Sequence, residues 1–254
     1  MESARRAPGC GRLRRSAACL VGALLAASAA ARTEPPDPAP FDAVLEARAR
    51  GGGFDYRAAT GQDRKRLAAY LANLADADPA GMRPEARKAF WINAYNAWAI
   101  QTLLDHPGKR ITDVSGAFDK ERHRIGGELA TLDDVENRLR ALGDARIHFA
   151  IVCASRSCPP LAPRAYRAEV LEEALERQAR AFVNDPSRNV VDPRKASPRL
   201  SMIFQWNRAE FERDAGSLNR YVSRYVSNPA AARWLAGDAG PPEFLDYDWS
   251  PNQP

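Results

Sequence analysis

A long helix that is apolar around almost its whole circumference constrains this chain more than any other feature. Residues 89–100 read AFWINAYNAWAI, and at about 100° per residue their aromatic side chains fall on one side of a helix and aliphatic side chains on its flank. A helix that is apolar on nearly all sides is normally buried, so the rest of the chain must pack around it. Two asparagines, Asn93 and Asn96, lie one turn apart on the remaining side.

These two amides need partners inside the protein, because a buried amide without hydrogen bonds costs about 1 to 3 kcal/mol. We expect Asn93 and Asn96 to reach the irregular backbone of residues 154–160, which follows Cys153, and to pair with its carbonyl and N–H groups. Such contacts would serve equally a loop held by a disulfide and a preorganised active site. The alternative is that each asparagine caps a nearby chain reversal unrelated to that loop.

The first 31 residues have the features of a secretory signal peptide. Five arginines precede an Ala/Leu-rich run that begins at Ala17 and ends in three alanines at residues 29–31. The apolar run is shorter than the roughly 20 residues that a membrane-spanning helix needs. We therefore expect an exported protein, periplasmic or secreted, with no transmembrane segment in the mature chain. A Pro-rich linker over residues 32–40 would precede a single domain over residues 41–254.

The predicted signal peptide also carries most of the positive charge. Its five arginines and one glutamate account for +4 of the formal +5, so the remaining 223 residues are close to neutral. This balance gives no reason to expect nucleic acid as a partner. The partner is predicted to be a small molecule or a protein, of a kind that the sequence does not specify, and the oligomeric state is equally open.

Periodicity and capping signals predict a helix-rich mixed α/β protein, one compact domain in which helices pack around a small central sheet. Thr131 and Asp134 form a capping-box pattern for one of the helices. Helices are expected over residues 41–50, 62–75, 84–105, 133–142, 162–184, 210–226 and 229–235. Strands are expected over residues 147–153, 189–192 and 200–204, with a further short strand near Gly126 and Gly127.

The segment HFAIVCASRSCPP, residues 148–160, holds the side chains with the clearest chemistry. One interpretation makes a thiol the nucleophile and His148 its base. His148 and Cys153 are five residues apart and would point to opposite faces of a regular strand, a difficulty that Cys158 does not share. The other interpretation is a Cys153–Cys158 disulfide that pins the loop, with His148 as a core histidine, and an oxidising compartment favours it. A redox-active pair is a third interpretation, which the absence of Cys-x-x-Cys spacing makes weaker.

The remaining ionisable side chains give weaker signals. Glu136 shares a helix face with Asp133 and could orient a histidine or accept a hydrogen bond from an asparagine, although such a residue more often faces water. His106 and His123 are interpreted as exposed surface residues. The sequence has no metal-ligand spacing, P-loop, dinucleotide-binding glycine motif or Gly-x-Ser-x-Gly motif, so it predicts neither a metal nor a cofactor.

Several motifs in a fixed order resemble the domain of unknown function 547 family. The strongest are FWINAYN at residues 90–96, LDDVE at residues 132–136 and HFAIVCASRSCP at residues 148–159. Further blocks at residues 54–56, 203–206 and 247–252 extend the resemblance from Phe41 to about Asn252. Departures occur at Glu210, where the family tends to have Asp, at Asn137, where it often has His, and at Pro251, where it usually has Leu. The resemblance implies exported or lipid-anchored bacterial relatives, and it implies no settled activity.

Two functional hypotheses follow, and whether the protein is an enzyme stays open between them. The first is an exported hydrolase or acyl transferase with a thiol nucleophile from Cys153 or Cys158 and His148 as base or orienting group. In this hypothesis Asn93 or Asn96 is a polar orienting group. The second is a noncatalytic envelope domain for binding or structure, in which the same residues form a disulfide-stapled, hydrogen-bonded core.

Overall fold

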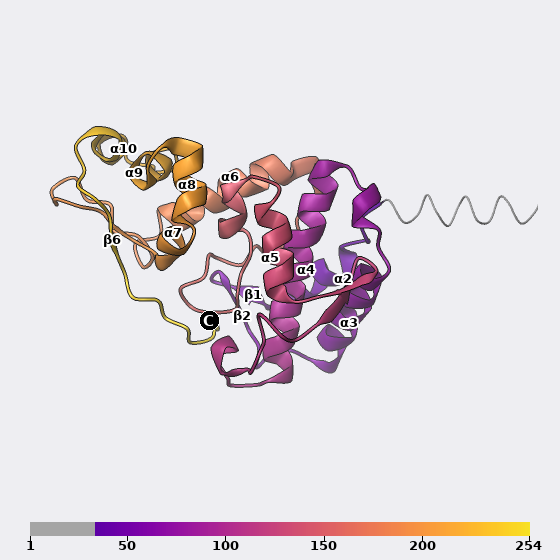
Figure 1. Cartoon of the computed structure of the whole chain (residues 1–254). Coiled ribbons are helices and arrows are strands. Elements are labelled where there is room, and N and C mark those ends of the chain that lie inside the picture. Colours follow the sequence, from indigo (N-terminus) through magenta and orange to yellow (C-terminus); the bar gives the residue numbers. More distant parts are fainter. Residues whose placement is uncertain (1–33) are drawn as a thin grey trace, which may run out of the picture.

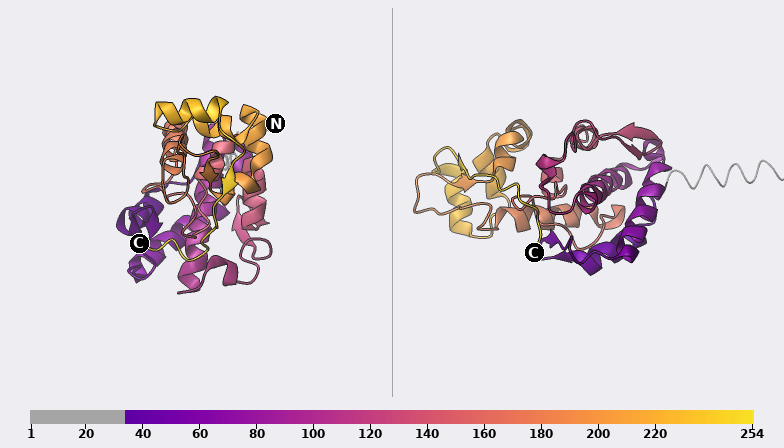
Figure 2. Two further views of the ribbon diagram at one scale, coloured as in Figure 1. Left: turned by 90° about the vertical axis from the view of Figure 1, so that its left-hand side faces the viewer. Right: turned by 90° about the horizontal axis from the view of Figure 1, so that it is seen from below.

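The computed structural model describes residues 34–254 (Figure 1). The predicted signal peptide and the first two residues of the predicted linker lie outside this range. Helix α4 (Pro84–Asp105) runs through the middle of the larger group of helices, with α2 (Ala39–Arg48) and α3 (Gly61–Ala75) on one side and α5 (Leu132–Arg140) on the other (Figures 1 and 2).

The predicted buried helix is confirmed. Fifteen of the 22 residues of α4 are buried, so both its aromatic side and its asparagine side face protein. Pro84 occupies the first turn, where its missing N–H is not needed, and the helix ends at Asp105, with His106 as its C-cap, ahead of Gly108, which has a positive φ of 80°. Short 3-10 helices precede and follow it, η1 (Pro79–Gly81) and η2 (Ile111–Asp113).

The helix-rich mixed class is confirmed, but the expected single central sheet is corrected. The described residues form three separate two-stranded sheets. They are antiparallel β1 (Ala49–Arg50) with β2 (Gly53–Phe54), antiparallel β3 (His123–Ile125) with β4 (Glu128–Ala130), and parallel β5 (Arg199–Leu200) with β6 (Glu243–Phe244). Near Gly126 and Gly127, where a short strand was expected, the chain forms a hairpin, and the turn that joins β3 to β4 has the positive φ at both glycines that a tight hairpin of this kind requires.

The apolar run at residues 147–153 is not a strand, contrary to the prediction. It begins as the 3-10 helix η3 (Ala145–Phe149) and continues as irregular extended backbone. Asp144 starts the helix, because its side chain accepts a hydrogen bond from the N–H of Arg146 at 3.1 Å. A short apolar run does not by itself distinguish a strand from a buried helical turn, and in the described part of the chain no strand pairs with this run.

The C-terminal half also differs from the prediction in its boundaries. The expected helix over 162–184 begins later, as η4 (Ala168–Val170) followed by α6 (Leu171–Val183). The expected strand over 200–204 is mostly helix, because Ser201 caps α7 (Met202–Trp206). The helix expected over 210–226 is two helices, since Gly216 adopts a φ of 80° between α8 (Arg208–Ala215) and α9 (Leu218–Ser223), and α10 (Pro229–Gly237) follows.

Two apolar cores meet at η3. Ile147 belongs to the larger core around α4, whereas Phe149 belongs to the smaller core of the C-terminal helices. There the Phe149 ring stacks on Phe182 at 5.0 Å and on Phe211 at 5.6 Å between ring centroids. His148 is therefore held at the junction of the two cores. Across residues 34–254 we find no helix with the length and apolar character needed to cross a membrane.

Candidate functional site

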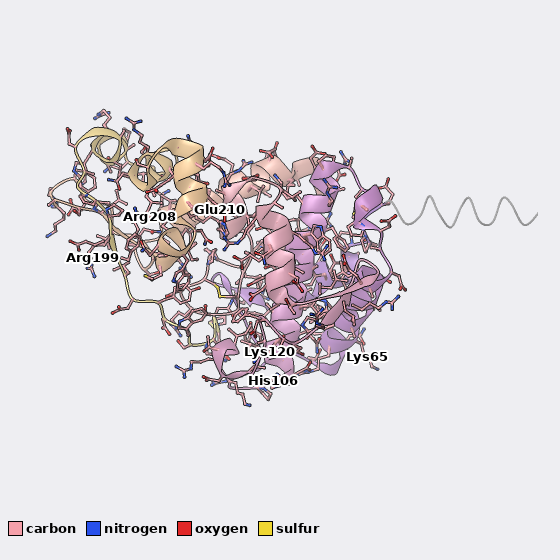
Figure 3. The ribbon with its side chains drawn as sticks, in the orientation of Figure 1. Lys65, His106, Lys120, Arg199, Arg208 and Glu210 are labelled. Carbon is pink, nitrogen blue, oxygen red and sulfur yellow. A yellow bond between two sulfur atoms is a disulfide. The ribbon has the colours of Figure 1, made fainter. Side chains whose placement is uncertain are left out.

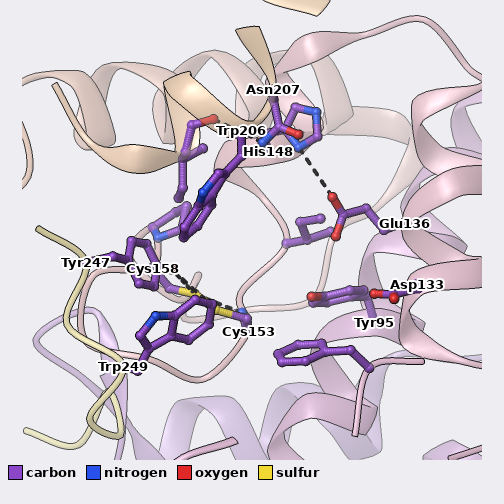
Figure 4. Close-up of a pocket in the computed structure, with 14 residues that line it drawn as sticks. Tyr95, Asp133, Glu136, His148, Cys153, Cys158, Trp206, Asn207, Tyr247 and Trp249 are labelled. Atoms are coloured by element: carbon purple, nitrogen blue, oxygen red, sulfur yellow. Dashed lines mark hydrogen bonds and ion pairs between the residues drawn. A yellow bond between two sulfur atoms is a disulfide. The ribbon is translucent and has the colours of Figure 1, made fainter. Parts of the chain in front are cut away.

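A pocket of about 220 Å³ opens where the two groups of helices meet. Helix α5 forms one wall, the segment between His148 and Pro159 a second, and α7 with Tyr247 and Trp249 the opposite wall (Figure 4). Four of the predicted site residues line this pocket: Glu136, His148, Cys153 and Cys158. The two asparagines of α4 do not.

Asn96 holds the backbone just before the sulfur loop, which is here defined as residues 153–158. Its Nδ2 donates to the carbonyl of Ala150 at 2.9 Å, and its Oδ1 accepts from the N–H of Val152 at 2.8 Å. The amide is buried, with the residue only 3% exposed. The predicted contact of Asn96 with residues 154–160 is therefore wrong, because its amide instead holds the backbone of residues 150–152.

Asn93 has a different partner, and its predicted contact with the sulfur loop is wrong. Its side chain donates to the carbonyl of Tyr166 and accepts from the N–H of the same residue, both at 2.8 Å. It therefore fixes the irregular segment before η4, and neither Asn93 nor Tyr166 lines the pocket. The two asparagines are one helical turn apart, yet their side chains bond to the backbone of two different segments. The bonded residues, Val152 and Tyr166, are 14 residues apart in sequence.

His148 lies in a network of charged side chains rather than beside a cysteine. Its Nε2 is 3.0 Å from Oε2 of Glu210, and its Nδ1 is 4.0 Å from Oε1 of Glu136. Arg140 bridges the two carboxylates, with Nη1 at 2.5 Å from Glu210 and Nη2 at 2.6 Å from Glu136. Figure 3 marks Glu210 on α8, at the boundary between the two groups of helices. Within residues 34–254 no hydrogen bond joins His148 to a sulfur.

This network shifts the ionisation of Glu210. Burial alone raises the pKa of the Glu210 carboxyl, but the hydrogen bond and charge of His148, together with the charge of Arg140, outweigh burial and leave that pKa below its usual value. Glu210 is thus ionised at neutral pH and holds the imidazole ring in one orientation. The hypothesis of His148 as a free general base for a thiol loses its geometric support.

Cys153 and Cys158 form a disulfide, with their Cα atoms 6.3 Å apart. Between them Ala154 adopts a φ of 63°, a left-handed conformation that residues other than glycine rarely take. The C-terminal segment holds the loop in this conformation. The N–H of Asn252 donates to the carbonyl of Ala154 at 3.0 Å, and the N–H of Arg156 donates to the carbonyl of Ser250 at 2.7 Å.

Carboxylates occupy the α5 wall of the pocket. Asp133 and Glu136 lie three residues apart on this helix, and in the described part of the chain Asp133 has no ion-pair partner, whereas Glu136 is paired with Arg140. Burial raises the pKa of the Asp133 carboxyl, and the nearby negative charges of Glu136 and Asp119 raise it further. Asp133 is exposed at the rim, so its carboxylate is open to a ligand.

Aromatic rings form the opposite wall. Trp206 is the last residue of α7, while Tyr247 and Trp249 belong to the C-terminal segment (Figure 4). The centroids of these three rings lie 4.5 to 5.7 Å apart. Trp206 is 48% exposed, an unusual exposure for so large an apolar side chain. Tyr95 of α4 lies across the cavity from them.

Sequence reasoning missed several residues of this site. Four of them have no recognisable spacing relative to His148: Arg140, Asn207, Glu210 and Tyr247. Glu210 and the block that contains Tyr247 were noted only as part of the family resemblance. The interpretation of His123 as an exposed residue is also wrong. His123 is 5% exposed and stacks on Trp98 at 3.9 Å between ring centroids, outside the pocket.

The fold and the pocket define a helix-rich mixed α/β protein with a disulfide loop at the junction of two apolar cores. Residues 79–183 match the family model described as "Protein of unknown function, DUF547", and this match supports the resemblance to that family over this part of the chain. The matched range includes α4, α5, η3, both cysteines and α6, while the extension of the domain to residues 41–254 stays a prediction. Neither the curated proteins nor the solved structures contain a match to the chain.

Proposed function

We propose that this protein is an exported binding domain whose pocket takes a small organic cation. The observation that carries the proposal is the composition of the pocket. Carboxylates of α5 face aromatic rings of the C-terminal segment, and among residues 34–254 no lysine or arginine lines the cavity. An anionic ligand would meet uncompensated negative charge at Asp133, whereas a cation would be attracted by that carboxylate and by the faces of the rings.

The state of the sulfur atoms favours binding over the thiol hydrolase or acyl transferase hypothesis. Cys153 and Cys158 are joined to each other, so neither carries the thiolate that acts as a nucleophile. His148 is engaged with Glu210 instead of a sulfur. The disulfide therefore supports the alternative hypothesis, a domain stapled by its cysteines.

Export is part of the same proposal. Its support is the arginine-rich, then Ala/Leu-rich leader that ends in small residues, together with a cysteine pair close enough to be oxidised. Disulfides persist in the periplasm or outside the cell and are rare in the cytosol.

A binding measurement with a matched pair of ligands tests the cation preference. Choline and 3,3-dimethyl-1-butanol have the same shape, but only choline is charged. We expect choline to bind about tenfold more tightly, because a cation over aromatic faces gains roughly 1 to 2 kcal/mol. Isothermal titration calorimetry at low ionic strength gives both affinities, and equal affinities would refute the proposal.

Asp133→Asn isolates the contribution of the unpaired carboxylate. We expect this variant to weaken choline binding about tenfold, equivalent to roughly 1.4 kcal/mol, and to leave the neutral ligand unaffected. Asp246→Asn is the matched control, since Asp246 is exposed on the same C-terminal segment as Tyr247 but does not line the pocket. An equal loss in both variants would assign the effect to overall charge.

The state of the cysteines can be tested directly by alkylation without reduction, followed by peptide mass spectrometry. We expect the peptide with Cys153 and Cys158 to remain unalkylated in the protein as purified. A free sulfur that is alkylated rapidly at neutral pH would support the thiol hydrolase or acyl transferase instead.

A further inference from the structure

The two sulfurs of the disulfide differ in their access to solvent. Cys158 is 2% exposed, whereas Cys153 is partly exposed, and both line the pocket. An attacking group that enters the pocket therefore meets Cys153 first. If the bond between the sulfurs breaks under such an attack, the electrons of that bond stay on the buried atom, Cys158.

Hydrogen-bond donors converge on this buried sulfur. The N–H of Cys153 donates to Sγ of Cys158 at 3.0 Å, the hydroxyl of Tyr247 lies 3.2 Å away and the hydroxyl of Ser155 lies 3.3 Å away. Both hydroxyls also lie within reach of Sγ of Cys153, at 3.0 Å for Ser155 and 3.4 Å for Tyr247. Only the amide is directed to Cys158 alone, so the donor set as a whole favours negative charge on Cys158.

Each hydroxyl has one proton to give, and two of the possible arrangements direct a hydroxyl proton to Cys158. Ser155 and Tyr247 donate separately to Cys158, or Ser155 donates to Tyr247, whose oxygen is 3.1 Å away, and Tyr247 donates to the sulfur. In both, the tyrosine must keep its proton. Burial raises the pKa of Tyr247 to about 12, so its hydroxyl remains a donor at neutral pH.

These donors have a chemical consequence. A buried thiol in apolar surroundings has a raised pKa and is a poor leaving group, but donors to sulfur stabilise the thiolate and reverse this effect. In thiol–disulfide exchange, a leaving thiol with a lower pKa departs faster.

We propose that the Cys153–Cys158 disulfide is redox-active and exchanges with a small dithiol that enters the pocket. The first thiolate of the dithiol attacks Sγ of Cys153, a mixed disulfide forms there, and Cys158 leaves with the bonding electron pair as a thiolate. The second thiolate of the dithiol then attacks the dithiol's own sulfur in the mixed disulfide and releases Cys153. The dithiol is oxidised by two electrons to a cyclic disulfide, and its two protons pass to the two cysteines, directly or through solvent.

Dithiothreitol is the probe for the rate of this exchange, followed by acid quench, alkylation and peptide mass spectrometry, which separates Cys153 and Cys158 from the cysteines of the leader. We expect Tyr247→Phe and Ser155→Ala each to slow reduction about tenfold. Tyr56→Phe is the matched control, because its hydroxyl bonds to Asn252 of the same C-terminal segment and touches neither sulfur. Rates for the two site variants equal to or above that of Tyr56→Phe would overturn the proposal.

A second measurement reports on Cys158 itself. In a Cys153→Ser background the pH dependence of Cys158 alkylation gives its thiol pKa. We expect a midpoint below the ordinary value of about 8.5 and a rise of roughly one unit when Tyr247→Phe is added. A midpoint at or above the ordinary value would overturn the proposal even if all variants fold. Both measurements are made without choline, so their outcome is independent of the cation site.

Discussion

Asn96→Ala is expected to lower the free energy of unfolding by about 3 kcal/mol, because it leaves two buried backbone groups without partners. The carbonyl of Ala150 and the N–H of Val152 lie in irregular backbone, where no helix or sheet supplies a replacement. For a chain of this size the loss corresponds to a fall of roughly 10 °C in Tm, measurable by calorimetry or circular dichroism.

Asn93→Ala is the matched control for the location of this effect. Both asparagines are on α4, both are buried and both pair with a backbone N–H and a carbonyl, so a similar loss of stability is expected. Hydrogen exchange separates them. Asn96→Ala should increase exchange at the amide of Val152, and Asn93→Ala at the amide of Tyr166. An unchanged Tm, or faster exchange at the wrong segment, would contradict the assignment of these contacts.

Asp144→Asn is expected to lower the free energy of unfolding by about 2 kcal/mol at pH 7. The variant should also lose the part of the acid-range pH dependence of stability that Asp144 causes. Asp144 links α4 to η3, since its carboxylate is 2.7 Å from Nζ of Lys88 and 2.9 Å from Nη2 of Arg146. Burial raises its pKa, but the hydrogen bonds and charges of Arg146 and Lys88 outweigh burial and lower that pKa to about 2.

The sign of the effect follows from the direction of the shift. A carboxyl whose pKa is lower in the folded state stabilises the fold above its unfolded pKa, near 3.8, and loses that contribution as the pH falls through about 2. Urea unfolding at pH 7 and near pH 2 should therefore show a large difference between wild type and variant at pH 7 and a small one at the lower pH. Asparagine also caps helices, so the cap of η3 is retained.

Asp192→Asn provides a comparison in which the neighbouring arginine is exposed. The pKa of Asp192 is also lowered to about 2, chiefly by hydrogen bonds from Arg194, yet Arg194 is 88% exposed and solvent screens the pair. We expect a smaller loss of stability at pH 7 than for Asp144→Asn. Equal losses of stability in the two variants would show that the burial of Asp144 between α4 and η3 does not strengthen its ion pairs.

Local signals in the sequence were sufficient wherever the deciding contacts are close in the chain. The capping box of Thr131 and Asp134 and the proline start of α4 both depend on residues within one turn of each other. The apolar circumference of α4 fixed its burial for the same reason. The spacing of Cys153 and Cys158 likewise allowed a short-loop disulfide to be proposed.

The site could be predicted only in part, because proximity in sequence does not specify the partner of a side chain. Glu136, His148 and both cysteines do line one pocket, as their chemistry suggested. Yet His148 pairs with Glu210, 62 residues further along the chain, and the aromatic wall includes Tyr247, which reaches Cys158 from 89 residues away.

The sequence by itself thus determined a buried central helix with two amides that need partners, the cap of one helix and the resemblance to a family. The tertiary structure decided that residues 147–153 are a 3-10 helix and irregular backbone, that Asn96 and Asn93 hold different segments, and that carboxylates face aromatic rings across a disulfide. The physical reason is the range of the interactions. Helix periodicity and caps act over three to four residues, whereas hydrogen-bond partners of buried amides, imidazoles and sulfurs are chosen by the segments that core packing brings together.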